Sequence, residues 1–335
     1  TSQECFVARP NTSNPIAIHH IIFANDIANG CSQGGFSVVN NGNVGVDYIA
    51  VVGSIAYNAA QGSGSCTSGI SIYQPVQSDS LHGTHIYVAG NFSYKNLEPS
   101  QCAGGVPTDG EGIIFDTFDG SQGNMPAPYA AQAVAENNIL LANGSSGVEV
   151  FNNSAGSSHA AIYLRNNTSW GNLTDPNRSS TGCGDISINR TLNTQVYNNL
   201  VSTNSATGCG GNPIYALSIA SGNATDQVYS NFAYGVNNQN TFLYNNGTFT
   251  LGSNNVLGIN PSYSNPVVPA APNCAATSSV PSCMAPVIAN FMPTNPSALA
   301  FGYQIPSGTA AYDPLFPQWL CNVNLPAGLV SMGCQ

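Results

Sequence analysis

The sequence predicts an all-β fold, a parallel β-solenoid of about eight or more coils that occupies residues 1–260. Two observations lead to this prediction: helical patterns are nearly absent, and a short unit of strands and turns recurs along the chain. The 335 residues include 35 glycines and 21 prolines, and with many asparagines they interrupt every window long enough for an amphipathic helix. The short β-branched runs between Asn and Gly turns are typical of strands.

The recurring unit contains a Gly-led apolar strand, a polar turn, a second strand that ends in Asn-Asn, and a third strand before Asn-Gly. Aligning the copies on the second turn gives one column of residues: Asp26, Ser54, Asn91, Asn138, Asn167, Asn199, Asn231 and Asn255. Stacked amides satisfy one another and the turn backbone at a corner between sheets. We therefore expect Asp26 to belong to this ladder, and the glycosylation sequons at Asn91 and Asn167 to face inward and stay unmodified.

Through this repeat, which covers about residues 16–260, the chain resembles the right-handed parallel β-helix proteins of the pectate lyase superfamily. The resemblance implies a right-handed coil and a carbohydrate-active protein. That superfamily includes polysaccharide lyases, glycoside hydrolases, epimerases and non-catalytic phage or adhesin spikes, so the fold does not choose a chemistry. The site has to be argued from the side chains that the strands turn outward.

The two ends of the predicted solenoid differ. The repeat is already running by Ile16, so we expect a preceding segment or a neighbouring subunit to cover its first edge. A monomer and a homo-oligomer both stay open. Residues 261–335 are rich in proline and carry four cysteines, which indicates a disulfide-tied tail that caps the last coil.

The cysteines and the charge limit where the protein acts and what it binds. Ten cysteines without a repeated zinc spacing indicate an oxidising compartment and a secreted, extracellular protein. The expected pairs are Cys274/Cys283, Cys321/Cys334, Cys66/Cys102 and Cys183/Cys209, although spacing does not establish connectivity. Five Lys and Arg residues and a net charge of −10 disfavour nucleic acid and anionic membrane as partners, and no apolar run is long enough for a membrane span.

The Gly-led strands predict which side chains line a groove, because every second residue of a strand faces out. The outward pairs are Ser37/Val39, Ser71/Tyr73, Ile114/Asp116, Glu149/Phe151, Ser187/Asn189 and Ser218/Ala220. Only the middle coils present both carboxylates and aromatic rings. The longest interval of the repeat separates Asn91 from Asn138, and its extra loops near residues 97–131 are expected to form the walls of a cleft for a polysaccharide.

The catalytic candidates come from the acidic stretch "TDGEGIIFDTFDG" at residues 108–120 and from the coils around it. Asp116 ends an apolar strand and faces the predicted cleft. Glu149 lies one coil further and two residues back along the strand, which places the two Cα atoms about 8 Å apart. Side-chain rotation around that value covers the carboxylate separation of an inverting glycoside hydrolase and touches that of a retaining one, so the spacing permits hydrolysis without choosing its stereochemistry.

A lyase needs a base, and related lyases commonly use Lys or Arg. Lys95 is the only lysine. Alternation turns Phe92 and Tyr94 inward, and Lys95 ends this strand just before the insertion. It could therefore lean toward the cleft. Arg190 follows Asn189 on the groove side and is the second candidate for the base.

Further residues are candidates for binding metal or sugar. Asp109, Asp116 and Asp119 could converge on Ca²⁺, which takes six to eight oxygen ligands, and the resemblance favours this reading; Asp109-Gly and Asp119-Gly are also ordinary turn dipeptides. Tyr73 and Phe151 would stack on sugar rings on either side of Asp116. The other candidate substrate-binding residues are Gln74, Asp185 and Asn189.

The two outward acids suit hydrolysis, whereas the resemblance to the pectate lyase superfamily favours a secreted polysaccharide lyase that acts on a uronate-containing glycan by β-elimination, and we place the lyase first. A net charge of −10 disfavours a polyuronate unless Ca²⁺ mediates its binding. The alternatives are an inverting glycoside hydrolase that uses Asp116 and Glu149, and a non-catalytic glycan-binding spike or adhesin. The clustered acids on one central coil count against the last alternative.

Overall fold

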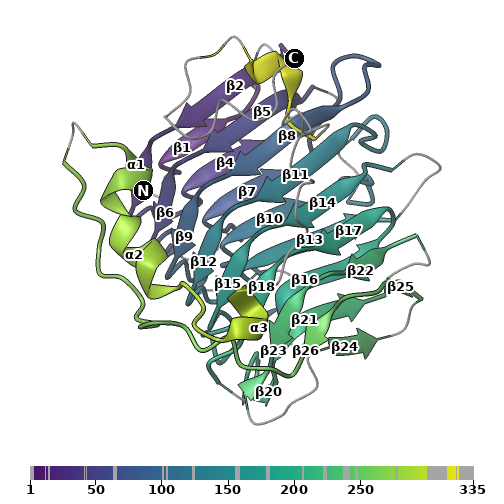
Figure 1. Cartoon of the computed structure of the whole chain (residues 1–335). Coiled ribbons are helices and arrows are strands. Elements are labelled where there is room, and N and C mark those ends of the chain that lie inside the picture. The colour runs from purple at the N-terminus through teal and green to yellow at the C-terminus, as the bar shows by residue number, and fades with distance from the viewer. Residues whose placement is uncertain are drawn as a thin grey trace.

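The computed structural model of the protein describes residues 4–11, 13, 16–40, 42, 44–62, 66–99, 102, 105–122, 125–154, 159–178, 182–205, 207–221, 225–236, 242–245, 248–275, 278–299, 315–321 and 323. Within these residues the chain winds through three eight-stranded sheets whose neighbouring strands all pair in parallel (Figure 1). Each coil contributes one strand to each sheet in turn. This arrangement confirms the predicted parallel β-helix.

Sheet A consists of β1 (Phe6–Ala8), β4 (Phe36–Val39), β7 (Ile70–Tyr73), β10 (Ile113–Asp116), β13 (Val148–Asn153), β16 (Gly184–Thr191), β21 (Tyr215–Ala220) and β24 (Phe242–Asn245). Sheet B consists of β2 (Ile18–Ala24), β5 (Val46–Val52), β8 (Thr84–Ala89), β11 (Gln132–Glu136), β14 (Ile162–Arg165), β17 (Thr194–Tyr197), β22 (Gln227–Tyr229) and β25 (Thr250–Leu251). Sheet C consists of β3 (Ile27–Asn29), β6 (Ile55–Tyr57), β9 (Phe92–Tyr94), β12 (Ile139–Leu141), β15 (Thr168–Trp170), β18 (Leu200–Ser202), β23 (Phe232–Tyr234) and β26 (Val256–Leu257). A short hairpin, β19 (Thr207–Gly208) with β20 (Asn212–Pro213), projects from one coil.

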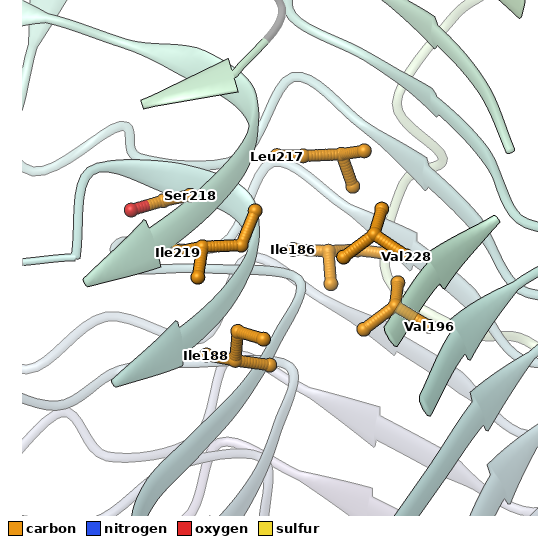
Figure 2. Close-up of a pocket in the computed structure, with 7 residues that line it drawn as sticks. All are labelled: Ile186, Ile188, Val196, Leu217, Ser218, Ile219 and Val228. Atoms are coloured by element: carbon orange, nitrogen blue, oxygen red, sulfur yellow. The ribbon is translucent and has the colours of Figure 1, made fainter. Parts of the chain in front are cut away.

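The interior of the coils is filled by apolar side chains that alternate with outward residues. Figure 2 shows six of them from sheets A and B, namely Ile186, Ile188, Leu217, Ile219, Val196 and Val228. They leave no room for a water molecule, whereas the hydroxyl of Ser218 points away from them. The interior is therefore a packed core rather than a channel, and only outward side chains can form a site.

The predicted asparagine ladder is present at the corner between sheets B and C. Asn138 shows its bonding: its Nδ2 donates to Asn167 Oδ1 at 2.9 Å and to the Val88 carbonyl at 3.0 Å. The same amide-to-amide bond continues through Asn199, Asn231 and Asn255. At the first coils the bond is to a backbone N–H: Ser54 Oγ accepts from the backbone of Asp26 at 3.1 Å. The ladder therefore joins the coils across their corner.

A second ladder, which the repeat did not predict, lies at the corner between sheets C and A. Asn96 Nδ2 donates to Asn143 Oδ1 at 2.9 Å, and Asn143 Nδ2 donates to Asn172 Oδ1 at 2.8 Å. The next member is Asp185, which accepts from the Asn172 amide and from Ser169 Oγ at 2.5 Å. In the sequence, the feature that marks this second ladder is the Asn-Gly dipeptide at Asn143, which is also typical of an ordinary turn.

The described part of the tail runs along the sides of the coils instead of capping the last one. The short helices α1 (Val280–Cys283) and α2 (Ala285–Asn290) lie against sheet C (Figure 1). Met284 and Phe291 pack there on Phe92 and Tyr94, so these two rings face out under the tail and not inward as alternation predicted. Later in the chain, Phe316 and the 3₁₀ turn Gln318–Leu320 pack on sheet B. The helix α3 (Pro296–Leu299) lies between α2 and Phe316 in the sequence. The apolar outer rings of sheets B and C explain this course, because they need cover from water.

Four disulfides are formed among the described residues: Cys5–Cys31, Cys66–Cys102, Cys183–Cys209 and Cys274–Cys283. Three of them were predicted, and Cys334 of the fourth predicted pair lies outside the described residues. These bonds indicate an oxidising environment. The longest described helix, α2, has six residues, so no described helix could traverse a bilayer.

Replacing a ladder residue should be costly because its partners have no water nearby. We expect Asn138→Ala to lower the free energy of unfolding by about 2–4 kcal/mol, since the Val88 carbonyl and the Asn91 amide lose their partner inside the protein. Denaturant unfolding would measure it. Asn177→Ala, at an exposed asparagine, should change stability by less than about 0.5 kcal/mol. Equal small effects of both changes would contradict a stabilising role of the ladder.

Candidate functional site

The outward residues of sheet A lie in the register that the sequence predicts. Tyr73 is opposite Asp116, and Asp116 is opposite Phe151. Glu149 is opposite Ile114, so it sits one strand from Asp116 and two residues back. With ~4.8 Å between strands and ~3.3 Å per residue, the Cα atoms of the two acids are about 8 Å apart.

A cleft of about 590 Å³ lies over these residues. Its floor is the outer face of β4, β7, β10, β13 and β16. The predicted loops do contribute to it, since Thr108 and Asp109 come from the loop before β10 and Gln122 comes from the loop after it. Its size falls within the range of ligand pockets, roughly 300–1,000 Å³.

Asp116 is partly exposed at the centre of this floor. Its Oδ1 accepts a hydrogen bond from Thr117 Oγ1 at 2.7 Å. Burial raises the pKa of Asp116 to about 7, and the nearby carboxylates of Glu111 and Asp119 add to the rise, while the Thr117 bond opposes it. Asp116 can therefore hold a proton near neutral pH and release it to a bound ligand.

A buried cluster of two glutamates and one arginine borders the same cleft. Arg178, which is 3% exposed, reaches from the loop before β16, and its Nη2 donates to Glu149 Oε2 at 2.7 Å and to Glu111 Oε1 at 3.1 Å. Glu111 is fully buried and also accepts from Ser68 Oγ at 2.5 Å and from Ser145 Oγ. Arg178 Nε donates to Ser145 as well, so the guanidinium is held in place by several bonds.

The cluster has more acids than cations. Burial raises the pKa of Glu149 well above its usual value, an effect that Arg178 opposes and Glu111 increases. Burial and the carboxylates of Glu111 and Asp116 likewise raise the pKa of Asp109. Burial and the neighbouring carboxylates therefore favour the protonated forms of Glu149 and Asp109, and Arg178 opposes this effect.

Aromatic rings flank Asp116 on both sides along the helix axis. The hydroxyl of Tyr73 donates to Gln122 Oε1 at 3.1 Å, and burial raises the pKa of Tyr73, as do the carboxylates of Asp116 and Asp109. On the other side, the guanidinium of Arg190 lies 5.7 Å from the centre of the Phe151 ring. Two rings in register with a central acid form a platform on which sugar rings can stack.

The three aspartates predicted to bind Ca²⁺ do not form a shared site. Both carboxylate oxygens of Asp119 accept backbone N–H groups, from Ser121 at 2.9 Å and from Ser154 at 3.0 Å. Among the described residues, the one group with three close ligand atoms is Cys66, Cys102 and Asp109, whose cysteines form a disulfide. These residues do not fit the predicted calcium site, because Asp119 serves as a loop tie.

Besides Asp119, three predicted site residues are not among those that line the cleft. Lys95 follows β9 on sheet C, and its Nζ donates to the Pro269 carbonyl of the tail at 3.1 Å; its strand faces a different side of the coil from sheet A. Asp185 is fully buried in the second ladder, and burial raises its pKa to about 7. Gln74 is fully buried at φ 51°, and its side-chain atoms have no hydrogen-bond partner among the described residues.

The other predicted residues do line the cleft: Asp109, Asp116, Glu149, Tyr73, Phe151, Asn189 and Arg190. Arg178 was not predicted, because it lies in a loop far from the acidic stretch in sequence. One signal was available, since Arg178 is one of only five basic residues in the chain and precedes the Cys183–Cys209 disulfide.

Comparisons of this chain with protein-family models, with curated proteins and with solved structures find no match. The function is therefore argued from the cleft itself.

Proposed function

We propose that the protein cleaves a polysaccharide in the sheet A cleft, as a secreted glycoside hydrolase with Asp116 as the general acid. The observation that carries this proposal is the position of Asp116. It lies between Tyr73 and Phe151 in one row of outward side chains, in a cleft whose lining spans five strands of sheet A, and its pKa is about 7. An extended chain of sugar rings fits such a row better than a compact ligand does.

The two acids would have opposite roles. Protonated Asp116 gives its proton to the glycosidic oxygen as the bond to the anomeric carbon breaks. Glu149 in its ionised form takes a proton from the water that forms the new bond to that carbon, and the bond from Arg178 favours this ionised form against the effect of burial. The Cα atoms of the two acids are about 8 Å apart, and side-chain rotation around that value covers the carboxyl separation of about 6.5–9.5 Å that leaves room for this water in inverting enzymes.

A specific observation also favours a second candidate, β-elimination on a uronate. Arg190 lines the cleft and is exposed, and it forms no ion pair within the part of the chain that the structure describes. It could remove the proton next to the uronate carboxylate, as the resemblance to the pectate lyase superfamily would imply. The hydrolase stands first because Lys95 lies outside the cleft.

One assay separates the candidates. The purified protein is incubated with polygalacturonate, alginate, xylan, arabinan and mixed-linkage glucan, with and without EDTA. New reducing ends without ultraviolet absorbance of an unsaturated uronate support hydrolysis; both signals together indicate elimination, and loss with EDTA indicates a metal. If neither signal appears with any of these polymers, the cleft is a binding site and the enzymatic proposal fails.

The pH profile should report the proton on Asp116. Because the pKa of Asp116 is raised to about 7 and the acid form is the active one, kcat/KM should fall about tenfold per pH unit above about 7. Initial rates between pH 5 and 9, on the substrate found above, measure this limb. A rate that stays constant through this range would contradict the assignment of Asp116 as general acid.

A further inference from the structure

A second cavity, of about 330 Å³, lies on sheet C and therefore on a different face of the coil from the cleft. It forms between the outer face of sheet C and the chain segment that follows β26. In Figure 1 the strands β15, β18 and β23 lie side by side there, next to the tail. The cavity shares no lining residue with the sheet A cleft.

The sheet places two aromatic rings on either side of a small residue. Trp170, Ser202 and Tyr234 are paired in register as the last residues of β15, β18 and β23. Trp170 and Tyr234 are thus two strands apart, about 9.6 Å between Cα atoms. Ser202 is short and 2% exposed, so the two rings stand on either side of a low, covered position, and all three residues line the cavity.

The tail holds this cavity in shape. Ser202 Oγ donates to the hydroxyl of Tyr263 at 3.2 Å, which places the Tyr263 ring on one side of the cavity. Phe291 contacts both Trp170 and Tyr263 edge to face, with 5.4 Å between ring centres in each pair. Burial raises the pKa of Tyr263 above its usual value, so its hydroxyl stays protonated. The aromatic walls are therefore organised before any ligand binds.

The chemistry of the lining limits the ligand. All ten lining residues are uncharged, so the cavity offers nothing to an ion. The indole N–H of Trp170, the hydroxyl of Tyr234 and the exposed amide of Asn204 have no hydrogen-bond partner within the described residues. A ligand that matches must have an apolar face for the rings and hydroxyl groups for these donors and acceptors.

We propose that this cavity binds a neutral pyranose unit of a glycan, as a second carbohydrate site on sheet C. A sugar ring has C–H groups on its faces that stack on Trp170 and Tyr234, and hydroxyls at its edge that reach the polar groups. The site goes beyond the proposed hydrolase, because it needs no proton transfer. It would hold a polysaccharide on one side of the coil while the cleft acts on the other.

The two tryptophans of the chain provide the test. The protein with isotope-labelled indoles is titrated with cellohexaose, xylohexaose, mannohexaose and hexagalacturonate while both indole N–H signals are followed by NMR. At least one neutral hexaose should shift the Trp170 signal in a saturable way, and hexagalacturonate should not. The Trp319 signal should not shift, because its indole N–H already donates to the Thr84 carbonyl at 3.1 Å.

Variants then separate this site from the cleft. Tyr234→Ala should weaken binding about tenfold or more, and Tyr234→Phe, which keeps the ring, should weaken it less. Tyr197→Ala, on sheet B of the coil that carries Ser202, should leave binding unchanged. The Asp116→Asn variant should also bind the neutral hexaose at this cavity as the wild type does. The binding test therefore does not depend on cleavage in the sheet A cleft. If no neutral hexaose moves the Trp170 signal at millimolar concentration, or if hexagalacturonate moves it equally, the proposal is overturned.

Discussion

Asp116→Asn should abolish cleavage, with a fall in kcat of about 10²–10⁴-fold. The amide keeps the size of the side chain but cannot donate a proton to a leaving oxygen. The fold should not suffer. Since the pKa of Asp116 is raised on folding, its contribution to stability is present below pH 4 and is lost as pH rises through about 7. At pH 8 the variant should unfold at the same denaturant concentration as the wild type or a higher one.

Asp185→Asn is the matched control for this change. Burial raises the pKa of Asp185 to about 7 as well, but its carboxyl group bonds to Asn172 and Ser169 in the second ladder. This variant should keep its activity per folded molecule. If Asp185→Asn removed activity while Asp116→Asn retained it, the cleft would be assigned to the wrong face.

Arg178→Met should cost about 3–5 kcal/mol of stability, the expected penalty for breaking a buried ion pair from one side. Its loss leaves the carboxyl groups of Glu111 and Glu149 buried without their cation. Urea unfolding at pH 7 would measure the change. The penalty should shrink as the pH is lowered from 7, because burial and Glu111 raise the pKa of Glu149 and a protonated carboxyl group needs no cation.

Arg9→Met provides the comparison, because Arg9 pairs with Glu4 at 2.5 Å while its side chain is 44% exposed. An exposed pair contributes about 0–1 kcal/mol. The double variant Arg178→Met with Glu149→Gln should recover part of the stability that Arg178→Met loses. No recovery, or equal costs for Arg9→Met and Arg178→Met, would show that the buried cluster is not held by charge.

Much of the cleft could be predicted because a β-solenoid translates sequence directly into position. Alternation within a strand assigns each side chain to the core or the surface, and the repeat assigns it to a coil. The alignment of Tyr73, Asp116 and Phe151 in one row therefore follows from the repeat alone. The same logic failed at Lys95, because the tail covers Phe92 and Tyr94, and a buried outer face has the same apolar pattern as an inner one.

The sequence by itself determined the coil, the first asparagine ladder and the row of outward residues on sheet A, because these depend on local periodicity and on equivalent positions one coil apart. Only the tertiary structure decided how the loops and the tail lie on that frame. It brought Arg178 to Glu111 and Glu149, buried Asp185 in a ladder, tied Asp119 to a loop and closed a cavity over Trp170. The reason is physical: such contacts join segments with no common period, so their partners are chosen by packing, charge and the exclusion of water.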